Sequence, residues 1–448
     1  MDIRRMTAVN TAKAASFASR LLGRGGTTFS GKVAMKLDPS VLKDLAGQVR
    51  RKIFVTCGTN GKTTTNNLLC SMLEAQGYKV VCNRMGANML EGVTAAFAGA
   101  ADISGNLDAD YACIEIDEAS AGKVFRYFKP DYMIITNLFR DQLDRYGEID
   151  IIMDVLEKAI RMAPDMKIIV NGDDSLAAFM AQETGNPYVC YGISEKVVSG
   201  QENSREVREG RFCKNCGALL EYDFYHYSQM GVYHCPSCSF KRPAIRYDAS
   251  KVSFGNGLAF DVNGRHLEAN YRGFYNIYNI LAVWSALNEA ALPTDTFNDV
   301  LGRYKPQFGR NEVFHLGESR VLLNLAKNPA GFNQNIAAVL EDDTPKDLII
   351  VINDNAQDGK DISWLWDVDF DSLSHESIRS ITVSGIRALD MHLRLKYVGI
   401  ESTTSPDTAS AIRQKLSEGC TNLYVLVNYT ALYDAHKLLQ EMEKKNEH

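Results

Sequence analysis

Residues 52–65, KIFVTCGTNGKTTT, constrain the fold of this 448-residue chain more than any other stretch. The β-branched and aromatic run 53–56 is typical of a buried strand, and after a turn with two glycines Lys62 and Thr63 begin an amphipathic helix. This order predicts a phosphate-binding loop: backbone N–H groups hold phosphate oxygens, the lysine reaches the outer phosphates and the threonine hydroxyl binds Mg²⁺. The common pattern GxxxxGK[ST] fails only at Thr56, which replaces its first glycine. A nucleoside triphosphate site is the interpretation, and a chance Gly-Lys-Thr at a helix start is the alternative.

Strand-like and helix-like runs alternate from this loop to about residue 200. That alternation predicts a parallel sheet with helices on both faces and ligands at the carboxyl ends of its strands. The expected strands after the loop are 78–82, 111–116, 132–136, 167–170 and 188–191.

Acidic residues follow two of these strands. Glu115, Asp117 and Glu118 lie at the tip of one strand, and Asp141 and Asp144 follow the next. Mg²⁺ prefers oxygen ligands and needs only one or two carboxylates besides phosphate and water. The acids therefore predict a magnesium site beside the phosphate loop, with solvated, helix-capping acids as the alternative.

Four of the ten cysteines form a separate pattern. They occur as CKNC and CPSC, separated by an aromatic-rich, hairpin-like segment: Cys213, Cys216, Cys235 and Cys238. Paired knuckles of this spacing predict a structural Zn²⁺ bound by four thiolates, with no open position for catalysis. Two disulfides are the alternative, which the absence of a secretion signal disfavours.

A second strand and helix alternation follows residue 313 and predicts a second α/β domain. After its second strand lies the loop 354–370, which is rich in Asp and Trp and is expected to carry function. The expected division is a helical lead-in, a central ATP-binding domain, a zinc-ribbon insert within that domain, and a C-terminal domain. These occupy residues 1–37, 38–312, 205–245 and 313–448.

Composition narrows the possible functions. A net charge of −6 argues against a nucleic-acid binder, so no nucleic-acid partner is expected. No run of 18 apolar residues is present, and Lys13 and Arg20 interrupt the N-terminal apolar stretch, so neither a spanning helix nor a secretory signal is predicted. A cytoplasmic protein is expected.

The motifs together resemble the Mur ligase superfamily, ATP-dependent enzymes that join an amine to a carboxylate. The segments that carry the resemblance occur in the family's order over about residues 30–330: GTNGKTTT, EIDE, TNLFRDQLDRYG, NGDD, YNIYN and FGR. The resemblance implies a central parallel-sheet ATPase domain and a Rossmann-like C-terminal domain. The family's usual N-terminal domain for a UDP-sugar precursor is not expected here, because only about 35 residues precede the central domain.

Within the superfamily the chain is similar to the synthetase subunits that amidate lipid II for peptidoglycan biosynthesis, together with the glutaminase GatD. The four-cysteine insert, GRGGTTFSGKVA (23–34) and DGKDISWLWD in the C-terminal domain carry this narrower match. It implies that the D-glutamate α-carboxylate of the stem peptide becomes an acyl phosphate, which ammonia converts to D-isoglutamine. It also implies a heterodimer with the glutaminase, acting on lipid II at the inner face of the plasma membrane.

The resemblance also implies roles for individual residues. Glu115 or Glu118 would be the metal carboxylate, and Asp361, or else Asp358, would serve the partner's Cys-His pair. The nucleotide would be bound by the loop and by polar groups beyond it: Gly58, Thr59, Asn60, Gly61, Lys62, Thr63, Thr64, Asn276, Arg310, Asn324 and Lys327. Gln142 stands where many relatives have histidine, which leaves the second metal ligand open.

An alternative function is a Mur or folylpolyglutamate-type ligase that adds an amino acid without a glutaminase. The sequence leaves open the ammonia route, the contacts with the lipid tail, the oligomeric state beyond a heterodimer and any role of the zinc ribbon beyond folding.

Overall fold

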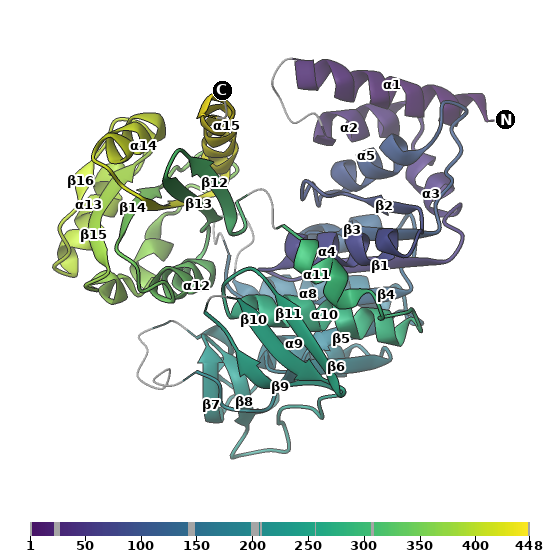
Figure 1. Ribbon diagram of the computed structural model, residues 1–448. Coiled ribbons are helices and arrows are strands. Elements are labelled where there is room, and N and C mark those ends of the chain that lie inside the picture. Colours follow the sequence, from purple (N-terminus) through teal and green to yellow (C-terminus); the bar gives the residue numbers. More distant parts are fainter. Residues whose placement is uncertain are drawn as a thin grey trace.

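The computed structural model describes residues 2–21, 27–141, 148–198, 206, 208–255, 257–305 and 309–446. The fold is built around two large sheets that have separate cores. Figure 1 shows these sheets side by side, and the helices α1, α2 and α5 form layers beyond one end of the first sheet. Among the described residues no helix combines the length and the apolar character that crossing a membrane requires.

The first sheet has nine strands in the order β11-β10-β9-β6-β5-β4-β1-β3-β2. From β2 to β9 the neighbouring strands are parallel, while β10 and β11 pair antiparallel as an added hairpin. The expected parallel strands are present, whereas the strands at 247–269 were not expected. Its strands are β1 (Lys52–Cys57), β2 (Val80–Cys82), β3 (Tyr111–Glu115), β4 (Tyr132–Ile135), β5 (Lys167–Asn171), β6 (Tyr188–Ile193), β9 (Tyr247–Ser253), β10 (Leu258–Val262) and β11 (Arg265–Ala269).

Helices cover both faces of this sheet because its strands are apolar on both sides. One core joins the sheet to α4 (Lys62–Ala75), α10 (Tyr275–Glu289) and α11 (Phe297–Arg303). The opposite core joins it to the remaining helices and helical turns of this half. These are α1 (Ile3–Leu21), α2 (Thr27–Leu37), α3 (Val41–Ala46), α5 (Leu90–Ala100), η1 (Glu118–Ser120), α6 (Ala121–Val124), α8 (Ile149–Arg161) and α9 (Ser175–Glu183).

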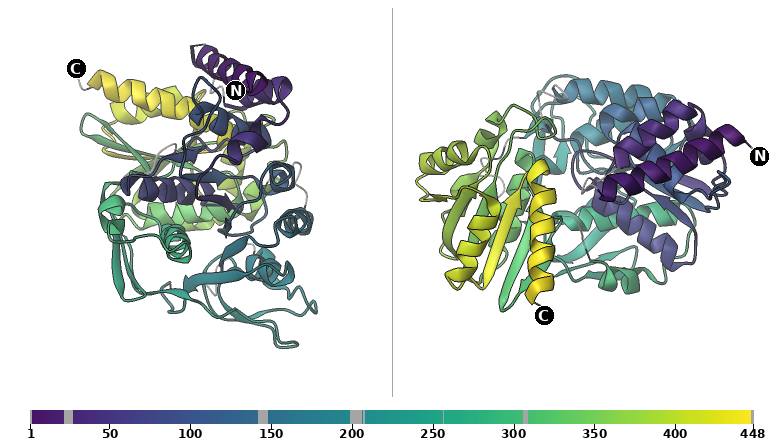
Figure 2. Two further views of the ribbon diagram at one scale, coloured as in Figure 1. Left: turned by 90° about the vertical axis from the view of Figure 1, so that its right-hand side faces the viewer. Right: turned by 90° about the horizontal axis from the view of Figure 1, so that it is seen from above.

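The second sheet has six strands in the order β12-β13-β17-β14-β15-β16, of which only β12 is antiparallel to its neighbour. Figure 2 shows its helices on both faces. The strands are β12 (Glu312–Leu316), β13 (Ser319–Leu325), β14 (Lys346–Val351), β15 (Ile378–Ser384), β16 (Thr403–Thr404) and β17 (Asn422–Val427). The helices and turns are α12 (Pro329–Leu340), η4 (Ser363–Asp367), η5 (Phe370–Leu373), α13 (Ala388–Tyr397), α14 (Thr408–Ser417) and α15 (Tyr429–Asn446).

The expected insert leaves the first sheet after β6 and returns at β9. It contains the turn η3 (Glu209–Arg211) and a two-stranded antiparallel sheet of β7 (Glu221–Tyr227) and β8 (Met230–His234). A small core of its own packs against α9 through Ala178 and Phe179.

Candidate active site

The phosphate loop joins the end of β1 to the start of α4. Gly58 and Gly61 have φ values of +119° and +83°, a region that side-chain-bearing residues rarely adopt. A Cβ on Gly58 would lie 2.3 Å from the Thr136 hydroxyl, and one on Gly61 would lie 2.2 Å from the Asn279 side-chain oxygen. Both positions therefore require glycine for conformation and for space.

Residues 136–139, which follow β4 and which we call the β4 strap, hold this loop in place. The Thr59 N–H donates to the Asn137 carbonyl at 2.9 Å, and the Asn60 N–H donates to the Asn137 side-chain oxygen at 2.8 Å. The Thr59 hydroxyl donates to the Phe139 carbonyl and accepts from the Phe139 N–H, both at 2.9 Å. Sequence reasoning named this segment as part of a family motif but did not predict that it holds the loop, although the polar pair Thr136-Asn137 at a predicted strand end is a usable signal.

Lys62 and Glu118 form a buried ion pair beneath the loop. Nζ of Lys62 lies 3.0 Å from Oε1 of Glu118 and donates to the Gly58 carbonyl at 2.5 Å, while the Gly58 N–H donates to the same Glu118 oxygen at 3.0 Å. Burial opposes the charge on Lys62, but the carboxylates around it, Glu118 first, outweigh burial and raise its pKa. Burial likewise opposes the charge on Glu118, and Lys62 keeps the pKa of that carboxyl low.

Thr63 and Glu115 supply oxygen atoms where a phosphate-bound Mg²⁺ is expected. The Thr63 hydroxyl donates to Oε2 of Glu115 at 2.6 Å, and Asn88 donates to Oε1 at 2.9 Å. A Cβ on Gly86 would lie 3.3 Å from the hydroxyl and 3.5 Å from the carboxylate, so a side chain there would crowd the pair. A hydroxyl and a carboxylate beside the phosphate loop are oxygen ligands of the kind that a magnesium ion takes, so these residues fit the ion.

Asn276, the predicted nucleotide residue on α10, lies under the loop together with Asn279. Asn276 and Asn279 are buried and hydrogen-bonded to each other at 2.9 Å, and the Asn279 oxygen accepts from the Thr65 hydroxyl at 3.3 Å. Asn276 also donates to the Arg272 carbonyl. Thr64 is buried in the first turn of α4. These asparagines therefore support the shape of the loop.

The C-terminal domain reaches the loop through the start of α12. The Asn60 and Asn328 side-chain amides exchange two hydrogen bonds, of 3.3 and 3.1 Å. Asn328 caps α12 by accepting from the Gly331 N–H, so the positive end of the helix dipole adjoins the phosphate loop. Lys327, beside Asn328, pairs with Asp141 of the central domain. Sequence reasoning predicted a nucleotide contact for Lys327 and assigned no role to Asn328.

Two other predicted nucleotide residues lie where the domains join. Asn324 and Asn311 are paired in both directions: Asn324 donates to the Asn311 side-chain oxygen at 2.8 Å and accepts from its backbone N–H. Asn311 has a φ of +54°, so this pairing stabilises a bend in the connecting segment. Arg310 lies within electrostatic range of the phenols of Tyr275 and Tyr304. Gln142 and Asp144 lie outside the described residues.

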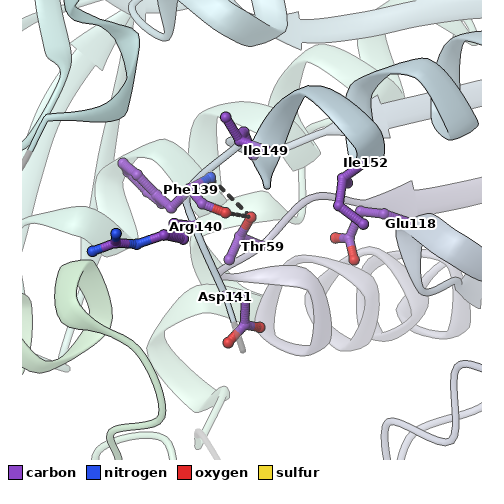
Figure 3. A pocket seen from close by; sticks show the side chains of 7 residues that line it. All are labelled: Thr59, Glu118, Phe139, Arg140, Asp141, Ile149 and Ile152. Atoms are coloured by element: carbon purple, nitrogen blue, oxygen red, sulfur yellow. Dashed lines mark hydrogen bonds between the residues drawn. The ribbon is translucent and has the colours of Figure 1, made fainter. Parts of the chain in front are cut away.

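A hollow of about 300 Å³, which includes its opening to solvent, lies beside the phosphate loop. Figure 3 shows its lining and the hydrogen bonds that join Thr59 to Phe139. Carboxylates, a guanidinium and two isoleucines of α8 surround it. The lining residues are Thr59, Glu118, Phe139, Arg140, Asp141, Ile149 and Ile152. The guanidinium of Arg140 pairs with Asp367 of the C-terminal domain and lies 3.3 Å from Glu209 of the insert.

The loop 354–370 holds the two acids that were predicted to serve a partner. Asp358 is buried and accepts from the Thr430 N–H at 2.8 Å, from the Thr430 hydroxyl and from the Asn355 N–H at 3.2 Å. Burial raises its pKa. Asp361 is half-buried, and the backbone N–H of Ser363, 2.8 Å away, keeps its pKa low. Asp358 thus fastens the loop to α15, whereas Asp361 is the more accessible carboxylate.

The four knuckle cysteines gather beside the small core of the insert, in which Cys213 and Cys235 are buried. Their sulfurs lie within 4.8 Å of one another, with 3.5 Å between the Cys213 and Cys238 sulfurs and between the Cys216 and Cys235 sulfurs. All four cysteines are free thiols in the structure, which does not contain the two disulfides of the alternative interpretation. Four sulfurs bound at about 2.3 Å around a tetrahedral ion are separated from one another by distances similar to these. The cluster therefore fits Zn²⁺.

Comparisons with known proteins place the chain in a family. The Mur ligase middle domain model matches residues 55–226, and the MurT ligase C-terminal model matches residues 325–432. A protein named lipid II isoglutaminyl synthase (glutamine-hydrolyzing) subunit MurT from Staphylococcus aureus is 38% identical over 89% of both chains. The protein of that name from Streptococcus pneumoniae is 32% identical over 98% of both chains.

A solved structure supports the fold. A pseudomurein peptide ligase type C from Methanothermus fervidus superposes with a TM-score of 0.65 at 19% identity, covering 89% of this chain and 80% of that one. Fold, family models and near full-length relatives agree: the chain belongs to the MurT family of the Mur ligase superfamily.

Proposed function

We propose that this chain is the synthetase subunit of a lipid II isoglutaminyl synthase, which amidates the D-glutamate α-carboxylate of the stem peptide at the expense of ATP. The observation that carries the proposal is the phosphate loop with its two carboxylate partners, Glu115 on Thr63 and Glu118 on Lys62. The names of relatives that match 89% and 98% of the chain supply the substrate and the reaction.

The chemistry requires activation of a poor electrophile. A carboxylate resists attack by ammonia at neutral pH, so transfer of the γ-phosphoryl group of ATP to the carboxylate oxygen first makes an acyl phosphate. Ammonia then attacks the carbonyl carbon, phosphate leaves and the amide remains. Lys62 and the backbone N–H groups of the loop would stabilise charge on the transferring group. Bound Mg²⁺, with Thr63 and Glu115 as ligands, would supply further charge neutralisation.

Ammonia must come from outside this chain. A glutaminase cysteine needs an accessible thiol with a low pKa. Outside the knuckles five of the six cysteines are buried, and burial raises the pKa of Cys190 to about 12 and that of Cys420 to about 11. We therefore include a glutaminase partner, resembling GatD, in the proposal, with one copy of each chain.

The C-terminal domain offers a surface for that partner next to Asp361. Leu389, Leu393 and Tyr397 are exposed along one side of α13, and the Trp366 ring lies 5.1 Å from that of Tyr397. Arg394 ties α13 to the loop by donating to the carbonyls of Leu365 and Val368. An apolar stripe joined to a loop with an accessible carboxylate suits a protein that needs a third residue beside its Cys-His pair.

The experiment uses the full chain with the glutaminase co-expressed from the same host and a lipid II substrate. ATP, Mg²⁺ and glutamine should together give a product in which a carboxylate has become a primary amide, identified by mass spectrometry. A product larger by a whole amino acid, formed without the glutaminase, would favour the amino-acid-adding ligase. Co-sedimentation of the protein with anionic vesicles that contain lipid II would support the proposal that the enzyme acts at the inner face of the membrane.

A further inference from the structure

The end of the β7–β8 hairpin, residues 227–230, is the most deeply buried part of the insert. Tyr227 is 5% exposed, Ser228 2%, and Gln229 and Met230 are both 0% exposed. Hairpin turns ordinarily face solvent. At the knuckle end of the insert Cys216 is exposed, while Cys213 and Cys235 are buried. The tip of the hairpin is therefore docked into the central domain.

The side-chain amide of Gln229 is hydrogen-bonded at both of its ends. Nε2 donates to the Leu138 carbonyl at 2.8 Å and to Oδ1 of Asp174 at 3.0 Å, and Oε1 accepts from the Gly210 N–H at 3.0 Å. A fully buried amide is costly unless its donors are used, and both donors are used here. The first contact crosses from the insert to the β4 strap.

Leu138 is held on both sides of its backbone. Its carbonyl accepts from Gln229, and its N–H donates to Oδ2 of Asp174 at 2.6 Å. Asp174 is itself fixed, because its other oxygen accepts from the Leu176 and Ala177 N–H groups at the start of α9. Gln229 and Asp174 thus hold the backbone of the strap in place at Leu138.

The strap carries this support directly to the phosphate loop. Asn137 and Phe139, the neighbours of Leu138, make the hydrogen bonds to Thr59 and Asn60 described above. One residue, Leu138, therefore separates the insert from the groups that fix the loop backbone. A shift of the strap would move Thr59 and Asn60, and with them the backbone of the phosphate loop.

The cysteine cluster is tied to the same point. Gly210, which donates to Gln229, precedes Cys213 by three residues, and its carbonyl accepts from the Ser175 hydroxyl at 3.1 Å. A Cβ on Gly210 would lie 2.3 Å from that hydroxyl, so the backbone is pressed against the start of α9. Cys213 packs with Ala178 of the same helix.

We infer that the four-cysteine insert positions the phosphate loop, with Gln229 as the positioning residue that acts through the β4 strap. Gln229 acts on the phosphate loop indirectly. It fixes Leu138, and the strap in turn fixes Thr59 and Asn60. The inference rests on the proposed nucleotide site.

The test is the variant Q229M in the full chain. Methionine has nearly the volume of glutamine but cannot donate to Leu138, so the packing of the tip is retained. The dissociation constant for ATP, measured by titration calorimetry, should rise about tenfold, which corresponds to the loss of about one net hydrogen bond. Hydrogen exchange in a peptide covering 57–64 should be faster than in the wild type, while exchange in the knuckles is unchanged.

The matched control is Q76M. Gln76 ends α4, away from the loop, and its Nε2 also donates to one carbonyl, that of Pro293, at 2.8 Å. It should leave ATP affinity and exchange at 57–64 unchanged. If Q229M does not fold, Q229N, which keeps the amide but is too short to reach Leu138, is measured in its place.

The outcomes separate the inference from the proposed function. Wild-type protein that does not bind ATP overturns the nucleotide site itself. Wild-type protein that binds ATP, together with a folded Gln229 variant that has the same affinity and the same exchange at 57–64, overturns only the positioning role. An equal loss in Q76M also overturns it, because the effect would then be general destabilisation.

Discussion

The ammonium group of Lys62 lies 3.0 Å from the carboxylate of Glu118, and both side chains are buried under the phosphate loop. The same Glu118 oxygen accepts from the Gly58 N–H, and Lys62 donates back to the Gly58 carbonyl. The lysine is thus bonded to the loop it is proposed to serve. When phosphate binds, its oxygens would replace these partners of Lys62, and the ammonium group would need to move only a short distance.

Lys62→Ala should abolish ATP-dependent amidation. One such electrostatic contact to a transferring group is typically worth about 3–4 kcal/mol, or roughly 10²–10³ in rate. Rates are compared at saturating ATP and ammonium, so that neither binding nor the glutaminase limits them. Lys79→Ala, which removes an exposed lysine paired with Asp108, is the control and should keep its activity. Activity of Lys62→Ala within about tenfold of the wild type would show that the loop has been misread.

Purified protein should contain about one Zn²⁺ per chain, measured by elemental analysis, because four free thiols surround a space that fits a tetrahedral ion. Cys213→Ser should lower both the zinc content and the melting temperature, since Cys213 is buried in the core of the insert. Cys420→Ser, which alters a cysteine of the C-terminal domain, should retain the zinc. A folded wild-type protein without metal would refute the zinc site.

Much of this architecture could be predicted because it follows from patterns of neighbouring residues in the sequence. Apolar runs gave the parallel strands of both sheets, and the Gly-Lys-Thr turn and paired CxxC knuckles are specific spacings. Glu115 and Glu118 could be named because polar residues at a strand end meet the loop of the neighbouring strand, and β1 indeed lies beside β3.

What could not be predicted depends on contacts between distant segments. Asn324 was expected near the nucleotide, but the structure pairs its amide with Asn311 at a bend of the connecting segment. Asn328 and Gln229 have no local signal, because each acquires its role only through a partner far away in the chain. In the added strands β9 to β11 buried residues are interrupted by exposed or half-buried ones, so these strands have no continuous apolar run.

Stability should fall at acidic pH in part through Asp342. Hydrogen bonds from Thr344 and Tyr424 outweigh its burial and lower its pKa well below the ordinary 3.8, and Arg272 of the central domain lies 3.3 Å from it. A carboxyl with a lowered folded-state pKa stabilises fully above its unfolded pKa, and the contribution is lost as pH falls through the folded pKa.

Asp342→Asn should therefore lower the free energy of unfolding by about 1–3 kcal/mol at pH 7 and by much less near pH 2. Urea unfolding at both pH values measures the difference. Asp371→Asn, at an exposed position of the same domain, is the control and should show little change at either pH. An Asp342→Asn deficit that stays constant down to pH 2 would contradict the titration of Asp342 as the cause.

Asp361→Asn should separate the two half-reactions. Asparagine keeps the size of the side chain but loses the charge that would stabilise an imidazolium in the partner, a loss that is severe in catalytic triads. With the glutaminase bound, glutamine-dependent amidation should collapse. Amidation driven by free ammonium at raised pH should persist, because the phosphate loop is untouched. Asp358→Asn is the contrast: it weakens the bonds to Thr430 and should lower the melting temperature first. If both activities of Asp361→Asn fall together, Asp361 serves the acyl-phosphate chemistry or domain closure. If neither falls, Asp358 becomes the candidate and the same pair of assays decides it.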